Sequence, residues 1–323
     1  MAKKNNTRTL LIILVVLIGF FALLQVRNRK SESTLRPDLI HVDTAKVTTI
    51  LLYPRAENGA ELKITKAKNG WRIQKGEKDA PVEAGSVKNI LTEVLRIRPK
   101  RLVAVSDTAW DNYSVTDSTA TRIIVQEGRK KTLDLYVGRF NVNQSSQMYG
   151  GYQGRVIGSS YIRPAGEKKV YEVDGFLALS FNQNFDAWRD HMFLRTTRGN
   201  LRKFNFTYPS DSGFVVENAD SLWKVDGIPA DSAGIQDYLS DWPFRRYSDF
   251  ADDFEPPANP DYQITAEGND MDPVVLKAYI HPKYRFVIHS SMNPETWFAD
   301  RDSTIFKTFF VPKAKFLNHP EDK

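Results

Sequence analysis

The sequence predicts an α+β protein in which an N-terminal transmembrane helix precedes two tandem, mostly antiparallel sheet units, each with one amphipathic helix. Three observations support this class: residues 9–26 are apolar and uncharged, a long part of the body occurs twice, and both copies alternate strand-like and helix-like patterns. We expect a membrane anchor with basic flanks at 1–30, a first repeat unit at 31–195 and a second at 196–323.

The expected anchor, residues 9–26, reads TLLIILVVLIGFFALLQV. A helix of this length spans about 27 Å, close to the hydrocarbon thickness of a bilayer. No small-residue cleavage site follows, which favours an uncleaved signal anchor over a cleaved signal peptide or a buried core helix. Basic residues flank both ends almost equally, so charge alone does not decide the orientation. Because the N-terminal tail is short, we expect a single pass with the body outside the cytoplasm.

Each copy opens with a predicted strand hairpin, at residues 51–73 and 206–225. The Tyr-Pro pair at 53–54 matches the pair at 208–209, and Trp71 matches Trp223. Apolar and polar residues alternate around a short polar turn, which indicates strands with one buried face.

An amphipathic helix of about three turns follows each hairpin, judged from helical spacing of apolar residues. The apolar face of the first helix contains Val87, Ile90, Leu91, Val94 and Leu95. The face of the second contains Ile235, Tyr238, Leu239 and Trp242. Asp231 is the expected N-cap of the second helix, and Pro243 is expected to end it.

A run of predicted strands completes each copy, at residues 121–139 with 159–173 and at residues 262–282 with 295–309. In this alignment Tyr161-Ile162 matches Trp297-Phe298. Val170-Tyr171 matches Ile305-Phe306. Residues 139–160 are rich in Asn, Gln, Ser and Gly, which predicts a long loop present only in the first unit.

Charge and cysteine content exclude several kinds of site. Six of the 45 basic residues lie in the first thirty positions, leaving 39 basic against 39 acidic residues in the body. A neutral body argues against a nucleic-acid partner, because phosphate binding needs a positive face. The chain has no cysteine, which excludes disulfides, thiolate metal sites and cysteine nucleophiles.

The motifs of the first copy carry a resemblance to a family. The runs Gly70–Ile73, Ala80–Leu91 and Arg101–Ala104, with Tyr161–Arg163 and Lys169–Val173, resemble the bacterial domain-of-unknown-function 4340 family across residues 40–310, as two successive copies. Tyr113 is followed by Ser114 where the family usually has Gly. The resemblance implies a membrane-anchored protein that faces the periplasm, encoded beside ABC transporter subunits of the gliding-motility type.

No residue pattern predicts a catalytic, cofactor or metal site. The loop residues Met148, Tyr149, Tyr152 and Arg155 are the candidate interaction site, because Tyr and Arg are favoured at protein interfaces; a flexible spacer is the competing interpretation. The tryptophans 71 and 223 and the Phe run at 306, 309 and 310 are interpreted as core.

Several polar groups could support chemistry but are interpreted as ordinary surface residues. Paired carboxylates could hydrolyse a glycoside at a suitable separation, and the candidates are Asp252, Asp253, Glu255, Asp300 and Asp302. An acid–base pair with a serine could come from Asp190, His191, His289, Ser290 and Ser291, but no nucleophile-elbow motif accompanies them.

We therefore expect a non-enzymatic accessory or binding module of a membrane assembly, with an ABC-type transporter as the expected kind. We expect the protein in the bacterial inner membrane, anchored there through residues 9–26. We expect transporter subunits as its partners and no cofactor. Two alternatives stay open: a cell-envelope hydrolase that uses loop carboxylates, and a purely structural spacer.

Overall fold

The structure is a computed structural model, which describes Leu14 and residues 39–144, 156–219 and 221–317. The expected anchor lies outside these residues except for Leu14. The candidate interaction residues Met148, Tyr149, Tyr152 and Arg155 lie outside them as well. Within the described ranges, no helix has the length and apolar character needed to cross a bilayer.

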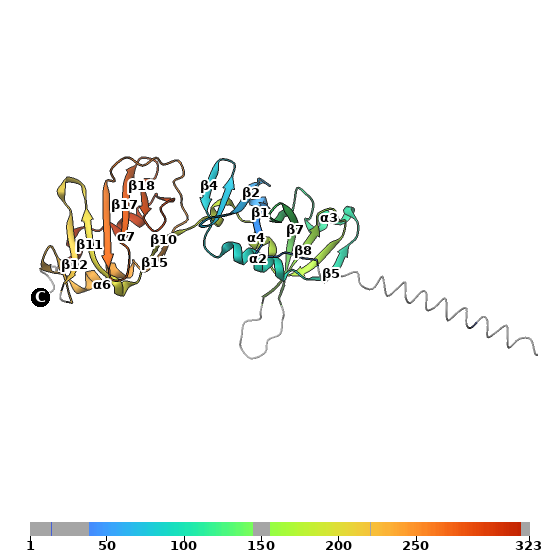
Figure 1. Cartoon of the computed structure of the whole chain (residues 1–323), viewed down its shortest axis with the longest axis horizontal. Coiled ribbons are helices and arrows are strands. Elements are labelled where there is room, and N and C mark those ends of the chain that lie inside the picture. The colour runs from blue at the N-terminus through green and yellow to red at the C-terminus, as the bar shows by residue number, and fades with distance from the viewer. Residues whose placement is uncertain (1–13, 15–38, 145–155, 220, 318–323) are drawn as a thin grey trace, which may run out of the picture. The chain divides into compact units, whose positions relative to one another are not determined.

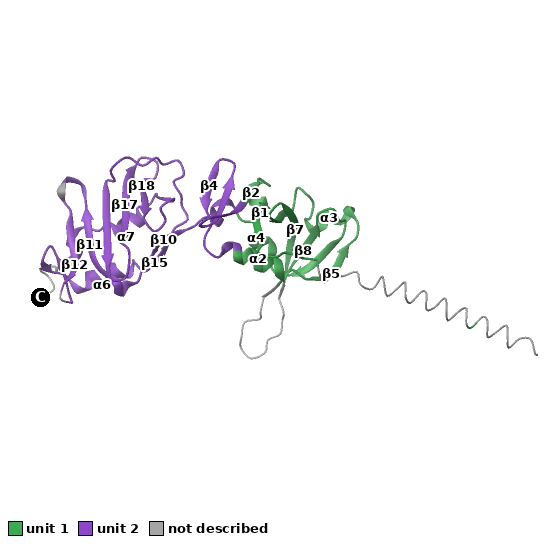
Figure 2. Cartoon of the chain, viewed as in Figure 1, with its two compact units in different colours: residues 1–63, 88–183 green, residues 64–87, 184–323 purple. Residues whose placement is uncertain are grey.

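The chain divides into two compact units (Figure 2). Unit 1 comprises residues 1–63 and 88–183, and unit 2 comprises residues 64–87 and 184–323. The hairpin of β3 (Gly70–Lys75) and β4 (Lys78–Pro81) therefore groups with unit 2, although the repeat in the sequence assigns it to the first copy.

The first sheet is antiparallel throughout its described pairings and has nine strands in the order β4-β3-β2-β1-β6-β7-β8-β9-β5 (Figure 1). Its remaining strands are β1 (Val47–Tyr53), β2 (Leu62–Ala67), β5 (Pro99–Ala104), β6 (Thr121–Glu127), β7 (Lys130–Gln144), β8 (Val156–Pro164) and β9 (Val170–Asp174).

One face of this sheet forms a core. Among the described residues of unit 1, the α-helices have 4 to 11 residues. Leu52, Ile123 and Leu135 lie opposite one another on neighbouring strands, and they and Ile162 are each at most 1% exposed. The predicted helix is α2 (Ser86–Arg96), which buries Val87, Ile90, Leu91 and Val94, whereas Leu95 is 37% exposed. The other helices are α3 (Trp110–Tyr113) and α4 (Leu177–Phe181).

Unit 2 is built on an eight-stranded antiparallel sheet in the order β14-β13-β12-β11-β16-β17-β18-β19. Its strands are β11 (Leu201–Thr207), β12 (Phe214–Ala219), β13 (Leu222–Val225), β14 (Ile228–Pro229), β16 (Tyr262–Gly268), β17 (Val274–His281), β18 (Arg285–Ser290) and β19 (Trp297–Asp300). A small second sheet pairs β10 (Met192–Arg195) with β15 (Phe244–Arg246). The helices are α5 (Phe185–Trp188), α6 (Ser232–Ser240) and α7 (Thr304–Phe309).

The core of unit 2 is strongly aromatic and confirms the predicted helix face. Ile235, Tyr238, Leu239 and Trp242 are at most 5% exposed. The Asp231 carboxylate accepts the backbone N–H of Gly234 at 2.7 Å, so the predicted N-cap is confirmed.

The predicted aromatic core residues differ in burial. Phe309 and Phe310 are buried, and the half-buried Phe306 packs against the same core. Trp223 is half-buried and stacks on Phe204 at 6.1 Å. Trp71 is also half-buried.

The two sheets share one strand order along the chain. In each, four consecutive strands run outward to one side and four later strands to the other, with a helix between the two groups; the first sheet adds β5 at its edge, next to β9. This is the arrangement that the repeat in the sequence predicts.

The predicted match of Tyr53 with Tyr208 is wrong by one residue. Leu52 pairs with Ile123, and its equivalent Phe206 pairs with Ile264, both in the buried rows. Tyr208 packs against the core of unit 2, whereas Tyr53 is on the face opposite Leu52. Side chains alternate along a strand, so a slip of one residue reverses the face.

Two further elements differ from the prediction. Residues 139–144 and 156–160, expected in a loop, belong to β7 and β8 and pair in register, because backbone pairing overrides a polar composition. Ile305 and Phe306, expected in a strand, lie in α7. The Asp300 carboxylate accepts their backbone N–H groups and so begins this helix.

Candidate functional site

A charged cavity of about 600 Å³ in unit 2 is the candidate site. It is lined by the β3–β4 hairpin, by α5 and its C-terminal end, by residues 250–253 between β15 and β16, and by residues in and next to β18 and β19. Three cations, five carboxylates and four aromatic rings contribute to the wall: Lys78, Arg189, Lys283, Glu77, Asp79, Asp252, Asp253, Glu295, Phe185, Phe250, Tyr284 and Trp297.

Arg189 is the buried centre of this cavity, at 6% exposure. An isolated antiparallel β-bridge pairs the backbone of Arg189 with that of Val82. Its guanidinium carbon lies 3.8 Å from the ring centroid of Phe250, and Nη1 donates to Asp252 Oδ1 at 2.6 Å. A buried guanidinium is tolerated only when it is paired in this way, and the aromatic face adds a cation–π contact.

Asp252 joins Arg189 to the hairpin. Its second oxygen, Oδ2, accepts a hydrogen bond from Lys78 Nζ at 2.9 Å. Partial burial alone would raise the pKa of Asp252, but the hydrogen bonds from Lys78 and Arg189 outweigh it, so the pKa is lowered. The carboxylate is therefore ionised at neutral pH.

Asp253, the next residue, belongs to a separate pair. It accepts hydrogen bonds from Lys283 Nζ, at 2.5 Å, and from the Tyr284 hydroxyl. These two donors, Lys283 first, lower the pKa of Asp253 to about 2. The consecutive aspartates thus hold two different cations at the cavity.

Three further ion pairs involve the hairpin and the residues directly after it. Arg72 lies 2.7 Å from Glu295 and 2.8 Å from Asp79, and Arg246 lies 2.6 Å from Glu83. The pair of Arg72 with Glu295 therefore connects the hairpin to the segment before β19.

Four of the five carboxylates considered for hydrolysis accept hydrogen bonds within the fold: Asp252, Asp253, Asp300 and Asp302. A glycosidase needs one carboxyl group kept protonated beside an ionised one. Asp252 and Asp253 both have lowered pKa values, and Glu255 is exposed outside the cavity wall. Burial raises the pKa of Asp300, but that carboxyl caps α7, and Asp302 accepts the N–H of Thr304.

The histidines and serines proposed for acid–base work do not form a catalytic pair in the described residues. His191 donates from Nε2 to the Asp186 carbonyl at 2.8 Å, and His289 donates from Nε2 to the Pro294 carbonyl at 3.2 Å. Burial lowers the pKa of His289. The hydroxyls of Ser290 and Ser291 accept backbone N–H groups instead.

The other polar groups in these motifs are also accounted for. Asp190 accepts the backbone N–H of Met192 at 2.9 Å. Across the described ranges, no three His, Asp or Glu side chains are grouped to hold a metal ion.

The cations of the cavity were missed by the sequence analysis. Lys78 and Lys283 have no local sequence signal, since Lys78 is an exposed lysine at the start of β4 and Lys283 is an exposed lysine of a turn. Arg189 has such a local signal: it is a charged residue in a segment rich in aromatic residues, directly after Trp188 and four residues after Phe185. Such a position favours a stacked guanidinium.

Comparison with known proteins gives one match. The family model described as "Domain of unknown function (DUF4340)" matches residues 71–265, more than half of the chain. No match was found among curated proteins or among solved structures.

Proposed function

The chain belongs to the DUF4340 family, whose description assigns no activity, and on that premise we propose that it is a membrane-anchored binding module. In this proposal residues 9–26 hold the body at the outer side of the bacterial inner membrane, in the periplasm. The body is an accessory part of a membrane assembly, with an ABC-type transporter as the proposed partner.

The observation that carries the proposal is the set of preformed ion pairs around Arg189, Asp252 and Lys78. Charged groups held in fixed positions beside aromatic rings recognise a partner without reorganising, which favours affinity and specificity. Acid–base catalysis would instead need a group whose pKa lies near neutral pH. The two aspartates of the cavity are both far below it.

The anchor and the charge distribution support the placement at a membrane. Residues 9–26 contain no charged side chain, and the basic excess of the chain lies in the residues that flank them. Lys and Arg in such flanks interact favourably with lipid headgroups.

A pull-down from the native membrane in mild detergent, followed by mass spectrometry, tests the proposal. We expect transporter subunits to be recovered with the full chain. Lys78→Glu places a carboxylate beside Asp252 and is expected to reduce that recovery. The matched control is Lys100→Glu, which changes an exposed ion pair with Asp174 in unit 1 and should leave recovery unchanged.

Each other outcome counts against the proposal. Recovery of the chain alone contradicts the transporter partner. Equal recovery with both variants contradicts the cavity as the contact and supports a spacer. A thermal unfolding curve of each variant distinguishes loss of the contact from loss of the fold.

A further inference from the structure

Four residues of unit 1 form a row across four neighbouring strands. Tyr53 is directly opposite Arg122, Arg122 is opposite Tyr136, and Tyr136 is opposite Arg163. Their guanidinium carbons lie 6.0, 5.1 and 3.9 Å from the successive ring centroids. Trp110 covers the other face of Arg163, also at 3.9 Å. We call this alternation of rings and guanidinium groups the ladder.

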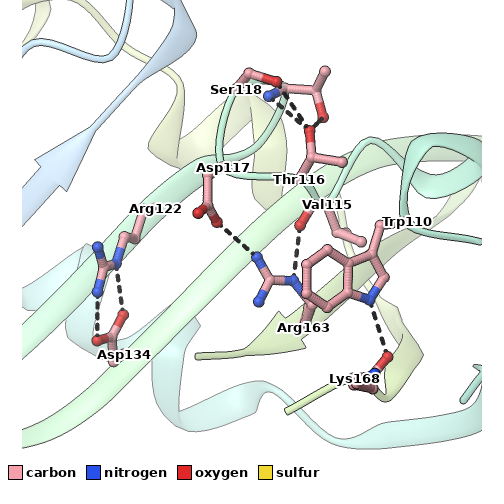
Figure 3. A network of polar contacts seen from close by, with 10 residues as sticks. Trp110, Val115, Thr116, Asp117, Ser118, Arg122, Asp134, Arg163 and Lys168 are labelled. Carbon is pink, nitrogen blue, oxygen red and sulfur yellow. Dashed lines mark hydrogen bonds and ion pairs between the residues drawn. The ribbon is translucent and has the colours of Figure 1, made fainter. Parts of the chain in front are cut away.

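The ladder is held rigidly by hydrogen bonds (Figure 3). Arg163, 3% exposed, donates to the Val115 carbonyl at 2.8 Å and to Asp117 at 3.0 Å. Arg122 donates from Nε and Nη2 to the two oxygens of Asp134, both at 2.8 Å. Bidentate pairs of this kind fix the plane of a guanidinium group.

The fold does not require the ladder, as the second copy shows. The residues at the same register positions in unit 2 are Thr207, Gln263, Lys277 and His289. That sheet has the same strand order without a guanidinium group in this row. The ladder is therefore a specialisation of unit 1 on the face opposite its core.

A cavity of about 570 Å³ lies beside the ladder. Tyr53, Arg122 and Tyr136 form part of its wall, together with Arg55 and Asp117. Arg55 is exposed and makes no ion pair with any residue that the structure describes. Arg122 uses Nε and Nη2 on Asp134, which leaves the Nη1 donors of the fork for another acceptor.

The polar groups of this cavity match a peptide better than a phosphate. Two guanidinium groups suit a planar carboxylate, which they can bind with paired hydrogen bonds. Asp117, 80% exposed at its side chain, adds a carboxylate that can accept peptide N–H groups, which a phosphate lacks. Asn58 contributes an amide that can donate and accept.

We propose that this cavity binds an acidic peptide segment of a partner protein, with its carboxylate held by Arg55 and Arg122. The ladder acts as the support that sets the position of Arg122. This second site lies within unit 1 and does not depend on the cavity around Asp252.

The test follows the arginine Nε–H signals of the full chain in detergent micelles by NMR. The probe is the peptide acetyl-Glu-Glu-Glu-amide, with acetyl-Gln-Gln-Gln-amide and inorganic phosphate as the comparison probes. We expect the Glu peptide to shift the Arg122 signal saturably. Arg55→Gln and Arg122→Gln should each weaken its binding by about tenfold or more, the usual loss when a charge-assisted hydrogen bond is removed.

The control variant is Arg129→Gln, which removes the same charge from an exposed turn of unit 1 away from the cavity wall. It should leave the affinity unchanged. Equal weakening in all three variants would show unspecific attraction and overturn the proposal. Equal binding of the Gln peptide, or saturation by phosphate without saturation by the Glu peptide, would overturn it as well.

Discussion

Asp252 and Arg189 form an ion pair with 2.6 Å between Oδ1 and Nη1, although 62 residues separate them in the chain. The same carboxylate accepts Lys78, which lies 174 residues before it. The pair therefore connects a hairpin, a short helix and a loop, and it determines how the cavity of unit 2 responds to mutation and to pH.

Asp252→Asn should destabilise the protein, because it removes the nearer of two carboxylates that pair with the buried guanidinium of Arg189; Asp186 stays 3.3 Å from Nη1. We expect a loss of about 2–3 kcal/mol in the free energy of unfolding, less than for a fully buried pair because Asp252 is partly exposed. Urea unfolding measures it. Asp174→Asn, at an exposed ion pair, should cost less than about 0.5 kcal/mol. Similar losses in both variants would contradict the central role of Arg189.

The pKa of Asp252 gives a pH dependence with a definite sign. Its pKa in the folded protein is lowered, whereas an aspartate in an unfolded chain has a pKa of about 3.9. The stabilisation is therefore present in full above about pH 4 and decreases as the pH falls through the folded value. Between pH 6 and about pH 3 the urea midpoint of the native protein should fall more than that of Asp252→Asn. Parallel curves would show that this carboxylate is not linked to folding.

Gly138 allows a close approach of two backbones in unit 1. A Cβ at this position would lie 2.1 Å from the Tyr113 carbonyl oxygen, and β7 shifts register between Val137 and Phe140. Gly138→Ala should destabilise by about 1–3 kcal/mol, as overpacking does. Gly199→Ala is the control, since nothing lies within 4 Å of its added Cβ. Thermal unfolding gives the melting temperature of each variant. Equal melting temperatures would show that the close approach of Tyr113 to Gly138 leaves room for a Cβ atom.

The cap of α6 is testable by one substitution. Asp231→Ala removes the acceptor of the Gly234 N–H and should cost about 1 kcal/mol. Asp231→Ser keeps an acceptor and should recover most of the loss. Urea unfolding distinguishes them; two variants of equal stability would show that the cap contributes nothing.

The anchor prediction is tested by cell fractionation. The full chain should stay with the membrane after a carbonate wash, and a chain without residues 1–30 should not. Protease added outside spheroplasts should digest the body of the full chain. A body protected while the inner membrane is intact would place it in the cytoplasm.

Local features of the fold were predictable from the sequence because they depend on near neighbours. The spacing of Val87, Ile90, Leu91 and Val94 predicted α2, and Asp231 predicted the start of α6. Helix periodicity and capping need only a few consecutive residues.

Features that depend on pairing were not predictable in the same way. The match of Tyr53 with Tyr208 failed by one residue, because identical residue types do not define which face a strand buries. The start of α7 depends on Asp300, whose carboxylate accepts two backbone hydrogen bonds. No local sequence pattern indicates these two bonds.

The candidate site was predictable only in part. Asp252 and Asp253 were recognised as loop acids, but their lowered pKa values come from Lys78 and Lys283, which lie far away in sequence. The row of Tyr53, Arg122, Tyr136 and Arg163 requires the register of four strands, and no sequence pattern alone specifies it.

The β3–β4 hairpin determines where the chain can be divided. It is encoded within the first copy of the repeat, yet it supplies Lys78 to the cavity of unit 2 and binds Glu295 through Arg72. A chain without the first copy would lack Lys78 and Arg189, the two cations that pair with Asp252. The two copies of the repeat are therefore not separable at the boundary between residues 195 and 196.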